Sequence, residues 1–108
     1  MAPHKLRRAL EFISDKLEQQ QGIALDVVAR EVGMSRYHFS RVFKESIGLS
    51  PINYIGRQRI ERAKKLLAET ELPIADIALQ AGFSGQSHFT TFFRKLVGLT
   101  PRSFRRGI

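Results

Sequence analysis

The sequence predicts an all-α fold in which two copies of one short helical motif are joined by a long helix, with about seven helices in total. Three observations support this prediction. Apolar residues recur every three or four positions along most of the chain, which is the period of a helix with one buried face. No segment alternates apolar and polar residues as a half-buried strand does. Two stretches of about 25 residues also resemble each other, so the chain contains an internal repeat.

The first helix is expected at residues 4–20. Its apolar stripe consists of Leu6, Ala9, Leu10, Ile13 and Leu17. The polar run Gln19, Gln20 and Gln21 followed by Gly22 is expected to end it, because glycine accepts the left-handed backbone that follows many helices. This helix and the first copy of the repeat form a subdomain predicted at residues 1–50.

A long helix is expected after Pro51, because proline fits the first turn of a helix. Its apolar stripe consists of Ile52, Ile55, Ile60, Ala63 and Leu67. The helix should end near residue 70, since the residue before Pro73 avoids the helical backbone. We therefore predict a linker helix at 51–70 between the first subdomain and a second one at 71–108.

The repeat has an offset of fifty positions over its second half. Gly48-Leu49-Ser50-Pro51 recurs as Gly98-Leu99-Thr100-Pro101, and His38-Phe39 recurs as His88-Phe89. Upstream the offset is 49, which matches the pairs Ala29 and Ala78, Gly33 and Gly82, and Ser35 and Ser84. One extra residue, Gly85 or Gln86, therefore follows Ser84. We expect the second helix of the second copy to begin later or to be tilted.

Each copy has the pattern of a helix-turn-helix, with a short helix, a turn and a second helix. The buried positions are expected at Leu25, Val28, Ala29, Val32, Phe39, Val42, Phe43 and Ile47, and again at Ile74, Ile77, Ala78, Ala81, Phe89, Phe92, Phe93, Leu96 and Val97. The turns are Gly33-Met34-Ser35 and Gly82-Phe83-Ser84. Small Ala29, four residues before Gly33, lets the two helices cross closely, and Ser35 is a good N-cap.

The remaining face of each second helix carries side chains of the types that contact base edges and phosphates in DNA-binding proteins. These candidate DNA-binding residues are Arg36, Tyr37, Ser40, Arg41 and Lys44 in the first copy, and Gln86, Ser87, Thr90, Thr91 and Arg94 in the second. Arginine pairs with guanine and glutamine with adenine, while serine and threonine accept several bases. One polar helix face is ordinary, but two such faces in duplicate turn motifs indicate double-stranded DNA.

Charge supports a polyanionic partner. The 108 residues contain 18 Lys and Arg against 10 Asp and Glu, a net charge of +8. No acidic residue follows Asp76. The candidate phosphate contacts near the C-terminus are Arg102, Arg105 and Arg106. A solvated basic tail is the alternative.

Composition excludes several classes. Cysteine is absent, which removes disulfide scaffolds, thiolate zinc sites and cysteine nucleophiles. No apolar run approaches the roughly 20 residues that span a bilayer, and the N-terminal residues lack the apolar core of a signal peptide, so we do not expect secretion. We expect a cytoplasmic protein without a metal, cofactor or small-molecule site.

With its paired motifs and the helix that joins them, the sequence resembles the DNA-binding domain of the AraC/XylS family. The matching residues run from Ile74 through Asp76-Ile77-Ala78, Gly82-Phe83-Ser84, Ser87-His88-Phe89, Phe93-Arg94-Lys95, Gly98 and Thr100-Pro101 to Phe104-Arg105, with Ala29, Gly33-Met34-Ser35, Phe39, Arg41 and Phe43-Lys44 in the first half. The resemblance covers roughly residues 4–107. It implies a bacterial regulator, often an activator, that binds asymmetric promoter sites in the nucleoid and contacts RNA polymerase.

The resemblance also implies particular base contacts. In short relatives similar to the multiple-antibiotic-resistance and superoxide-response activators, certain positions contact bases. The resemblance implies that the equivalent residues here are Tyr37, Ser40 and Arg41, and Gln86, Ser87, His88, Thr90 and Thr91. Tyr37 stands where those relatives often have tryptophan, and Ser40 and Thr91 stand where longer polar residues are common, so their operator sequence does not transfer. Most members carry a sensor domain, for which 108 residues leave no room. The chain is then a sensor-less regulator or a domain of a longer one.

The predicted function is sequence-specific binding by a monomer, with two helices in successive major grooves. Some 17 helical residues span about 25 Å, and successive groove segments lie about 34 Å apart. An enzyme is a rival interpretation, but the three histidines, His4, His38 and His88, have no partner set for catalysis. DNA-repair methyltransferases with a similar unit need cysteine. Non-specific architectural binding and a role as a protein-interaction adaptor are two further rival functions.

Overall fold

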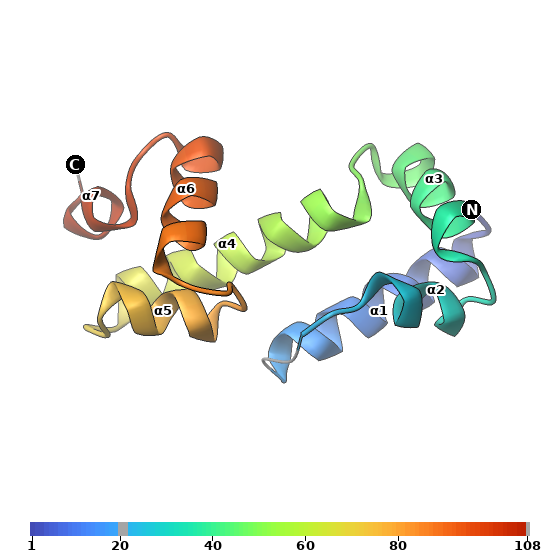
Figure 1. Cartoon of the computed structure of the whole chain (residues 1–108), viewed down its shortest axis with the longest axis horizontal. Coiled ribbons are helices and arrows are strands. Elements are labelled where there is room, and N and C mark those ends of the chain that lie inside the picture. The colour runs from blue at the N-terminus through green and yellow to red at the C-terminus, as the bar shows by residue number, and fades with distance from the viewer. Residues whose placement is uncertain (20–21, 108) are drawn as a thin grey trace. The chain divides into compact units, whose positions relative to one another are not determined.

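The computed structural model describes residues 1–19 and 22–107, and these form seven α-helices and no strand. The helices are α1 (Pro3–Glu18), α2 (Leu25–Glu31), α3 (Arg36–Ile47), α4 (Pro51–Glu69), α5 (Ile74–Gln80), α6 (Gln86–Val97) and α7 (Pro101–Arg106) (Figure 1). The all-α prediction is confirmed. Helix α1 ends at Glu18, whereas Gln20 and Gln21, at the predicted end of the first helix, lie outside the described residues.

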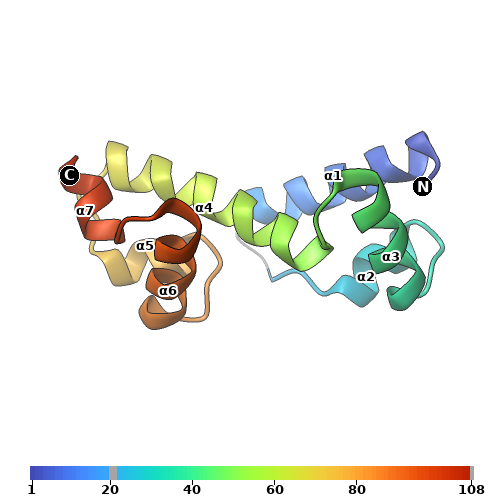
Figure 2. The ribbon, with the colours of Figure 1, turned by 90° about the horizontal axis from the view of Figure 1, so that it is seen from above.

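The chain divides into two compact units, Met1–Ile55 and Gly56–Ile108. Helix α4 contributes its first turn to unit 1 and the remainder to unit 2. Figure 2 shows α1, α2 and α3 grouped together in unit 1, and α5, α6 and α7 around the later part of α4 in unit 2. The predicted division into 1–50, 51–70 and 71–108 treats the whole linker helix as a separate part, and it stays a prediction.

The internal repeat is visible helix by helix. Helices α2 and α5 both have 7 residues, and α3 and α6 both have 12. Both longer helices end at a glycine with a left-handed backbone, Gly48 at φ 86° and Gly98 at φ 89°. The hydroxyl oxygens that precede the next helices also act alike. Ser50 Oγ accepts the Asn53 N–H at 3.2 Å, and Thr100 Oγ1 accepts the Ser103 N–H at 3.1 Å.

Each unit has its own core. The fully enclosed residues of unit 1 are Ala9, Ile13, Val28, Ala29, Val32, Phe39, Phe43 and Ile55. Those of unit 2 are Ile60, Ala63, Leu67, Ile77, Ala78, Ala81, Phe83, Phe89 and Phe93. The predicted stripes lie against these cores, although several members are only half-buried, among them Leu25, Ile47, Ile74 and Phe92. One member needs a correction. Ile52 was expected in the stripe of the long helix but is 61% exposed, since it follows Pro51 in the first turn of α4 and the core of unit 1 takes Ile55 instead.

The two turns differ in length, as the repeat predicted. Helix α3 follows its N-cap Ser35 directly, whereas α6 begins at Gln86 after the extra residue Gly85. Gly82 has φ +98°, a left-handed backbone that favours glycine, and a Cβ there would lie 2.7 Å from Arg59 Nε on α4, so that side chain would have to move. Partial burial at this place lowers the pKa of the Arg59 guanidinium from its usual value.

A second glycine allows α4 and α6 to approach each other within unit 2. A Cβ added to Gly56 would overlap the ring of Phe92. Glycine in the middle of a helix costs about 1 kcal/mol relative to alanine. The close approach of the Phe92 ring therefore explains why α4 contains a helix-weakening residue.

Candidate nucleic-acid interface

The predicted DNA-binding side chains of the first copy lie together on one face of α3. Arg36, Tyr37, Arg41 and Lys44 are exposed and Ser40 is half-buried, whereas Phe39, Val42 and Phe43 are buried on the opposite side. We call the first set the α3 face. Tyr37 is the most exposed large apolar side chain among the described residues, at 80%. An aromatic ring so open to solvent has no packing role, which leaves it free to contact a sugar or a thymine methyl.

Two arginines of the α3 face are paired with acids of their own unit. Arg36 Nε lies 4.0 Å from Asp26 Oδ1 of α2, and Arg41 Nη1 lies 3.7 Å from Glu45 Oε1 one turn further along α3. All four side chains are more than half exposed, so these pairs contribute little to stability. Sequence reasoning missed Glu45, although its spacing of four residues from Arg41 was a visible signal.

The second copy repeats the arrangement on α6. Gln86, Ser87, His88, Thr91 and Arg94 are exposed and Thr90 is half-buried, in the same order of exposure as the matching positions of α3. We call this set the α6 face. It contains no acidic residue, and none follows in the sequence. The two faces therefore differ in charge pattern, with acids beside the arginines of the first and only neutral polar and basic side chains on the second.

His88 on the α6 face is held by two neighbours from the preceding turn. Its Nδ1 lies 3.3 Å from Ser84 Oγ, and its ring meets the ring of Phe83 edge-on at 5.4 Å. Phe83 is buried and packs in turn against Phe89 and Phe92. Sequence reasoning named His88 as a candidate DNA contact but named Ser84 only as part of the turn.

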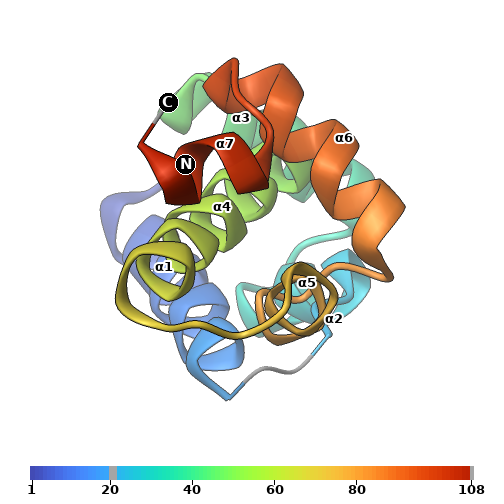
Figure 3. The same cartoon turned by 90° about the vertical axis from the view of Figure 1, so that its left-hand side faces the viewer.

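The three candidate phosphate contacts near the C-terminus have different surroundings. Arg105 donates from Nε, Nη1 and Nη2 to the backbone carbonyls of Leu67, Leu72 and Thr70, so most of its guanidinium is engaged within unit 2. The helix that carries it, α7, lies beside the later part of α4 (Figure 3). Arg102 and Arg106 are exposed. Arg102 also lines a hollow of about 380 Å³ together with Gln86, the first residue of α6. Of the three, Arg102 is thus associated with the α6 face.

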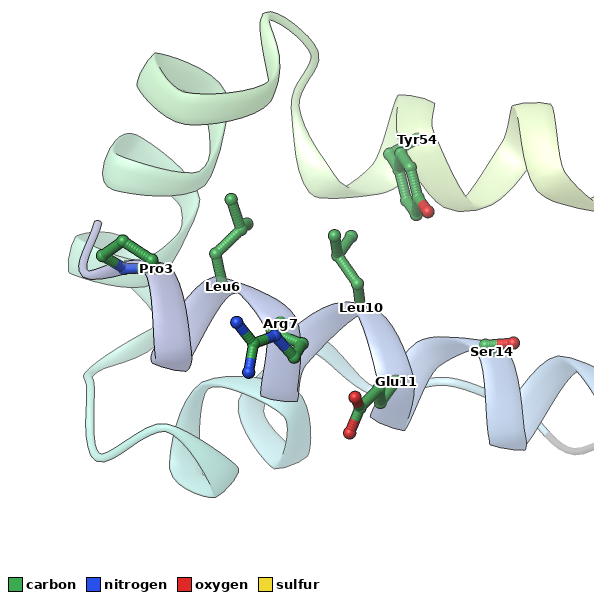
Figure 4. Close-up of a pocket in the computed structure, with 7 residues that line it drawn as sticks. All are labelled: Pro3, Leu6, Arg7, Leu10, Glu11, Ser14 and Tyr54. Atoms are coloured by element: carbon green, nitrogen blue, oxygen red, sulfur yellow. The ribbon is translucent and has the colours of Figure 1, made fainter.

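A different hollow lies on unit 1, between α1 and the start of α4 (Figure 4). Its volume is about 460 Å³, and Leu6, Leu10 and Tyr54 form its apolar floor, with Arg7 and Glu11 beside them. None of the predicted DNA-binding residues lines it. Within residues 1–19 and 22–107, no three histidine or acidic side chains gather as a metal site would require, and no helix is long and apolar enough to cross a membrane.

Two helix-turn-helix motifs, each with an exposed polar face on its second helix, define a DNA-binding protein of the helix-turn-helix class. Known proteins point to the same class. A family model described as a helix-turn-helix domain matches residues 28–107. The chain is 36% identical over 105 residues to the probable transcription factor PqrA of Proteus vulgaris, covering 97% of this chain and 86% of that protein.

The chain belongs to the AraC/XylS family of transcription regulators. It is 35% identical over 104 residues to the arabinose operon regulatory protein of Escherichia coli K12, of which it spans only 35%. The structure of the DNA-binding domain of AdpA, a global transcriptional factor solved in complex with a target DNA, superimposes with a TM-score of 0.83 at 25% identity over 93% of this chain and 91% of that one. These homologues are transcription regulators and not enzymes.

Proposed function

We propose that the chain binds one double-stranded promoter site as a monomer, with α3 and α6 each in a major groove, in successive turns of the duplex. The observation that carries this proposal is the matched exposure of the α3 and α6 faces, fifty residues apart. Single-motif repressors present two recognition helices by forming dimers. A chain that contains both motifs has no need of a second copy.

The side chains divide into base contacts and phosphate contacts. Arg41 is the candidate for guanine and Gln86 the candidate for adenine, since each offers the bidentate geometry that the base requires. Tyr37, Ser40, Ser87, Thr90 and Thr91 complete the base-contacting set. Arg36, Lys44, Arg94, Arg102 and Arg106 supply phosphate contacts, and they are exposed as that role demands. Arg105 leaves this set, because its donors are occupied within unit 2.

The regulatory role is activation through RNA polymerase, in the bacterial cytoplasm at the nucleoid. The 33% identity over 103 residues to the transcriptional activator RhaS of Escherichia coli supports activation. In vitro transcription with purified polymerase tests this part separately. A rise in transcript from a promoter carrying the selected site supports activation, and a fall shows repression.

Selection of bound sequences from a random duplex pool tests the binding mode. We expect an asymmetric site of about 20 base pairs that binds one chain, as measured by sedimentation of the complex. The selected duplex should compete at least a hundredfold better than a scrambled duplex at the same salt concentration. Equal competition by both duplexes would show architectural binding, and a palindromic site with two bound chains would contradict the monomer.

A further inference from the structure

Two equivalent serines act differently in the two motifs. Ser35 Oγ accepts the His38 backbone N–H at 3.2 Å and caps α3. The equivalent Ser84 makes no cap on α6, because Gly85 separates it from the helix. Its Oγ lies instead 3.3 Å from the Nδ1 of His88. Ser35 therefore contacts the backbone of its recognition helix, whereas Ser84, which precedes the extra residue of the second turn, contacts a side chain of its own recognition helix.

The His88 ring has a fixed support. The edge-on contact with Phe83 has an interplanar angle of 82°, and Phe83 is only 5% exposed. In the part of the chain that the structure describes, the ring of His38 has no hydrogen bond, and Ser35 accepts only from the His38 backbone N–H. A side chain that is already oriented loses less conformational freedom when it binds. His88 is therefore prepared for a contact in a way that His38 is not.

The position of His88 favours an anionic partner. It is the third residue of α6, where the backbone N–H groups have no intrahelical acceptor and no side chain caps them. Negative charge is stabilised at such a helix end. Ser84 occupies Nδ1, which leaves Nε2 as the ring nitrogen that is available to a partner.

We propose that Ser84 positions His88, so that the His88 Nε2–H donates to a DNA phosphate. The Ser84 hydroxyl donates to Nδ1, which keeps the ring proton on Nε2, and a phosphate oxygen can only accept. This inference rests on the proposed DNA binding and adds to it a residue outside the α6 face. Ser84 is a positioning residue, because it acts through His88.

The test uses the duplex recovered by selection and four variants. His88→Ala should weaken binding about tenfold, to the selected and the scrambled duplex alike, because a phosphate contact carries no sequence information. Ser84→Ala should weaken it about threefold, Ser84→Thr should restore it, and Ser84→Ala should add nothing in the His88→Ala background. Ser35→Ala is the matched control, since it removes a cap and leaves His88 untouched.

Two further readouts do not depend on binding affinities of the Ser84 variants. Long-range ¹H–¹⁵N spectra of the wild-type protein should show the His88 proton on Nε2, and Ser84→Ala should mix the tautomers while Ser35→Ala does not. Replacing single phosphates of the duplex by neutral methylphosphonates should identify one phosphate whose loss weakens wild-type binding but not that of His88→Ala.

The outcomes separate this inference from the proposed function. If the wild type discriminates the selected site while Ser84→Ala and the wild type bind alike, the positioning role is overturned and the DNA-binding function stands. A proton on Nδ1, or additive losses in the double variant, also overturns it. A loss for His88→Ala at one base pair only would overturn the phosphate contact and assign the ring to a base edge. If the wild type itself shows no duplex binding, the proposed function fails first.

Discussion

Arg105 Nη1 donates to the backbone carbonyl of Leu72 at 2.7 Å, which joins the last helix of unit 2 to the segment that leads into α5. The same guanidinium reaches the carbonyls of Leu67 and Thr70, at 3.2 Å each. Carbonyls at the end of a helix have no partner within it. Arg105 therefore serves the end of α4 as a side-chain cap that comes from α7.

Arg105→Ala should lower the free energy of unfolding by about 2–3 kcal/mol, because it leaves three half-buried carbonyl interactions without their charged donor. Arg105→Lys should recover little, since an ammonium group cannot match the planar arrangement of three donors. Denaturant unfolding measures both. Arg106→Ala is the control, and its exposed side chain should change stability by less than about 0.5 kcal/mol. Equal losses for the two alanine variants would contradict the capping role.

The paired phenylalanines should account for a large part of the stability of each unit. Phe43 packs on Phe39 and Tyr54 in unit 1, and Phe93 packs on Phe89 and Phe104 in unit 2. Both Phe43 and Phe93 are fully buried. Phe43→Ala or Phe93→Ala should cost roughly 3–5 kcal/mol by leaving a cavity. Thermal unfolding close to that of the wild type would show that the ring is not in the core.

Gly85→Ser should stabilise the protein by a few tenths of a kcal/mol, because glycine is itself a tolerable N-cap. Gly85 is the N-cap of α6 in an extended backbone, with φ 179° and ψ 177°, and an added Cβ meets nothing within 4 Å. A serine at this position can accept an N–H of the first turn, as Ser35 does for α3. The measurement is the unfolding midpoint, compared with Gly85→Ala, which fits the same space without a cap. Identical midpoints for the two variants would count against a cap at this site.

Arg41→Ala should relax base discrimination at one position of the site, at a cost of about 1–3 kcal/mol for the preferred base. The measurement is binding to duplexes that vary one base pair at a time. The control is Lys44→Ala, which should weaken binding to all duplexes equally and reduce the salt dependence. A uniform loss for Arg41→Ala would instead make Arg41 a phosphate contact, and a loss of folding would make it structural.

Local spacing explains why so much of the fold was predictable. The helical spacing of apolar residues is enough to predict the buried stripes of α3 and α6. The helix ends follow from backbone conformation alone, through Gly48 with Pro51 and Gly98 with Pro101. Arg105 could not be assigned in this way, because its partner Leu72 lies 33 residues earlier in the sequence. The pattern could not show that Ile52 is exposed either, since a helical period gives the stripe but not the surface that covers it.

The exposed residues of the candidate site were predictable from the sequence, whereas the side chains that contact them were not. Matching the two copies placed Tyr37 and Thr91 on exposed surfaces, because a buried stripe determines the face opposite to it. The partners Glu45 and Ser84 depend on side-chain conformation and on the path of a turn one residue longer than its equivalent. A single sequence does not contain that information.

The shared burial pattern of α3 and α6 has an evolutionary consequence. Tyr37, Arg41, Ser87 and Thr91 are exposed, and the rings that hold the helices in place are on the other side. Exchanging the exposed residues therefore leaves the packing of the protein almost unchanged, because surface substitutions cost little stability. Under the proposed binding mode, a lineage with this architecture can therefore change its operator in small steps, one half of the site at a time, while the other half keeps the protein at its promoter.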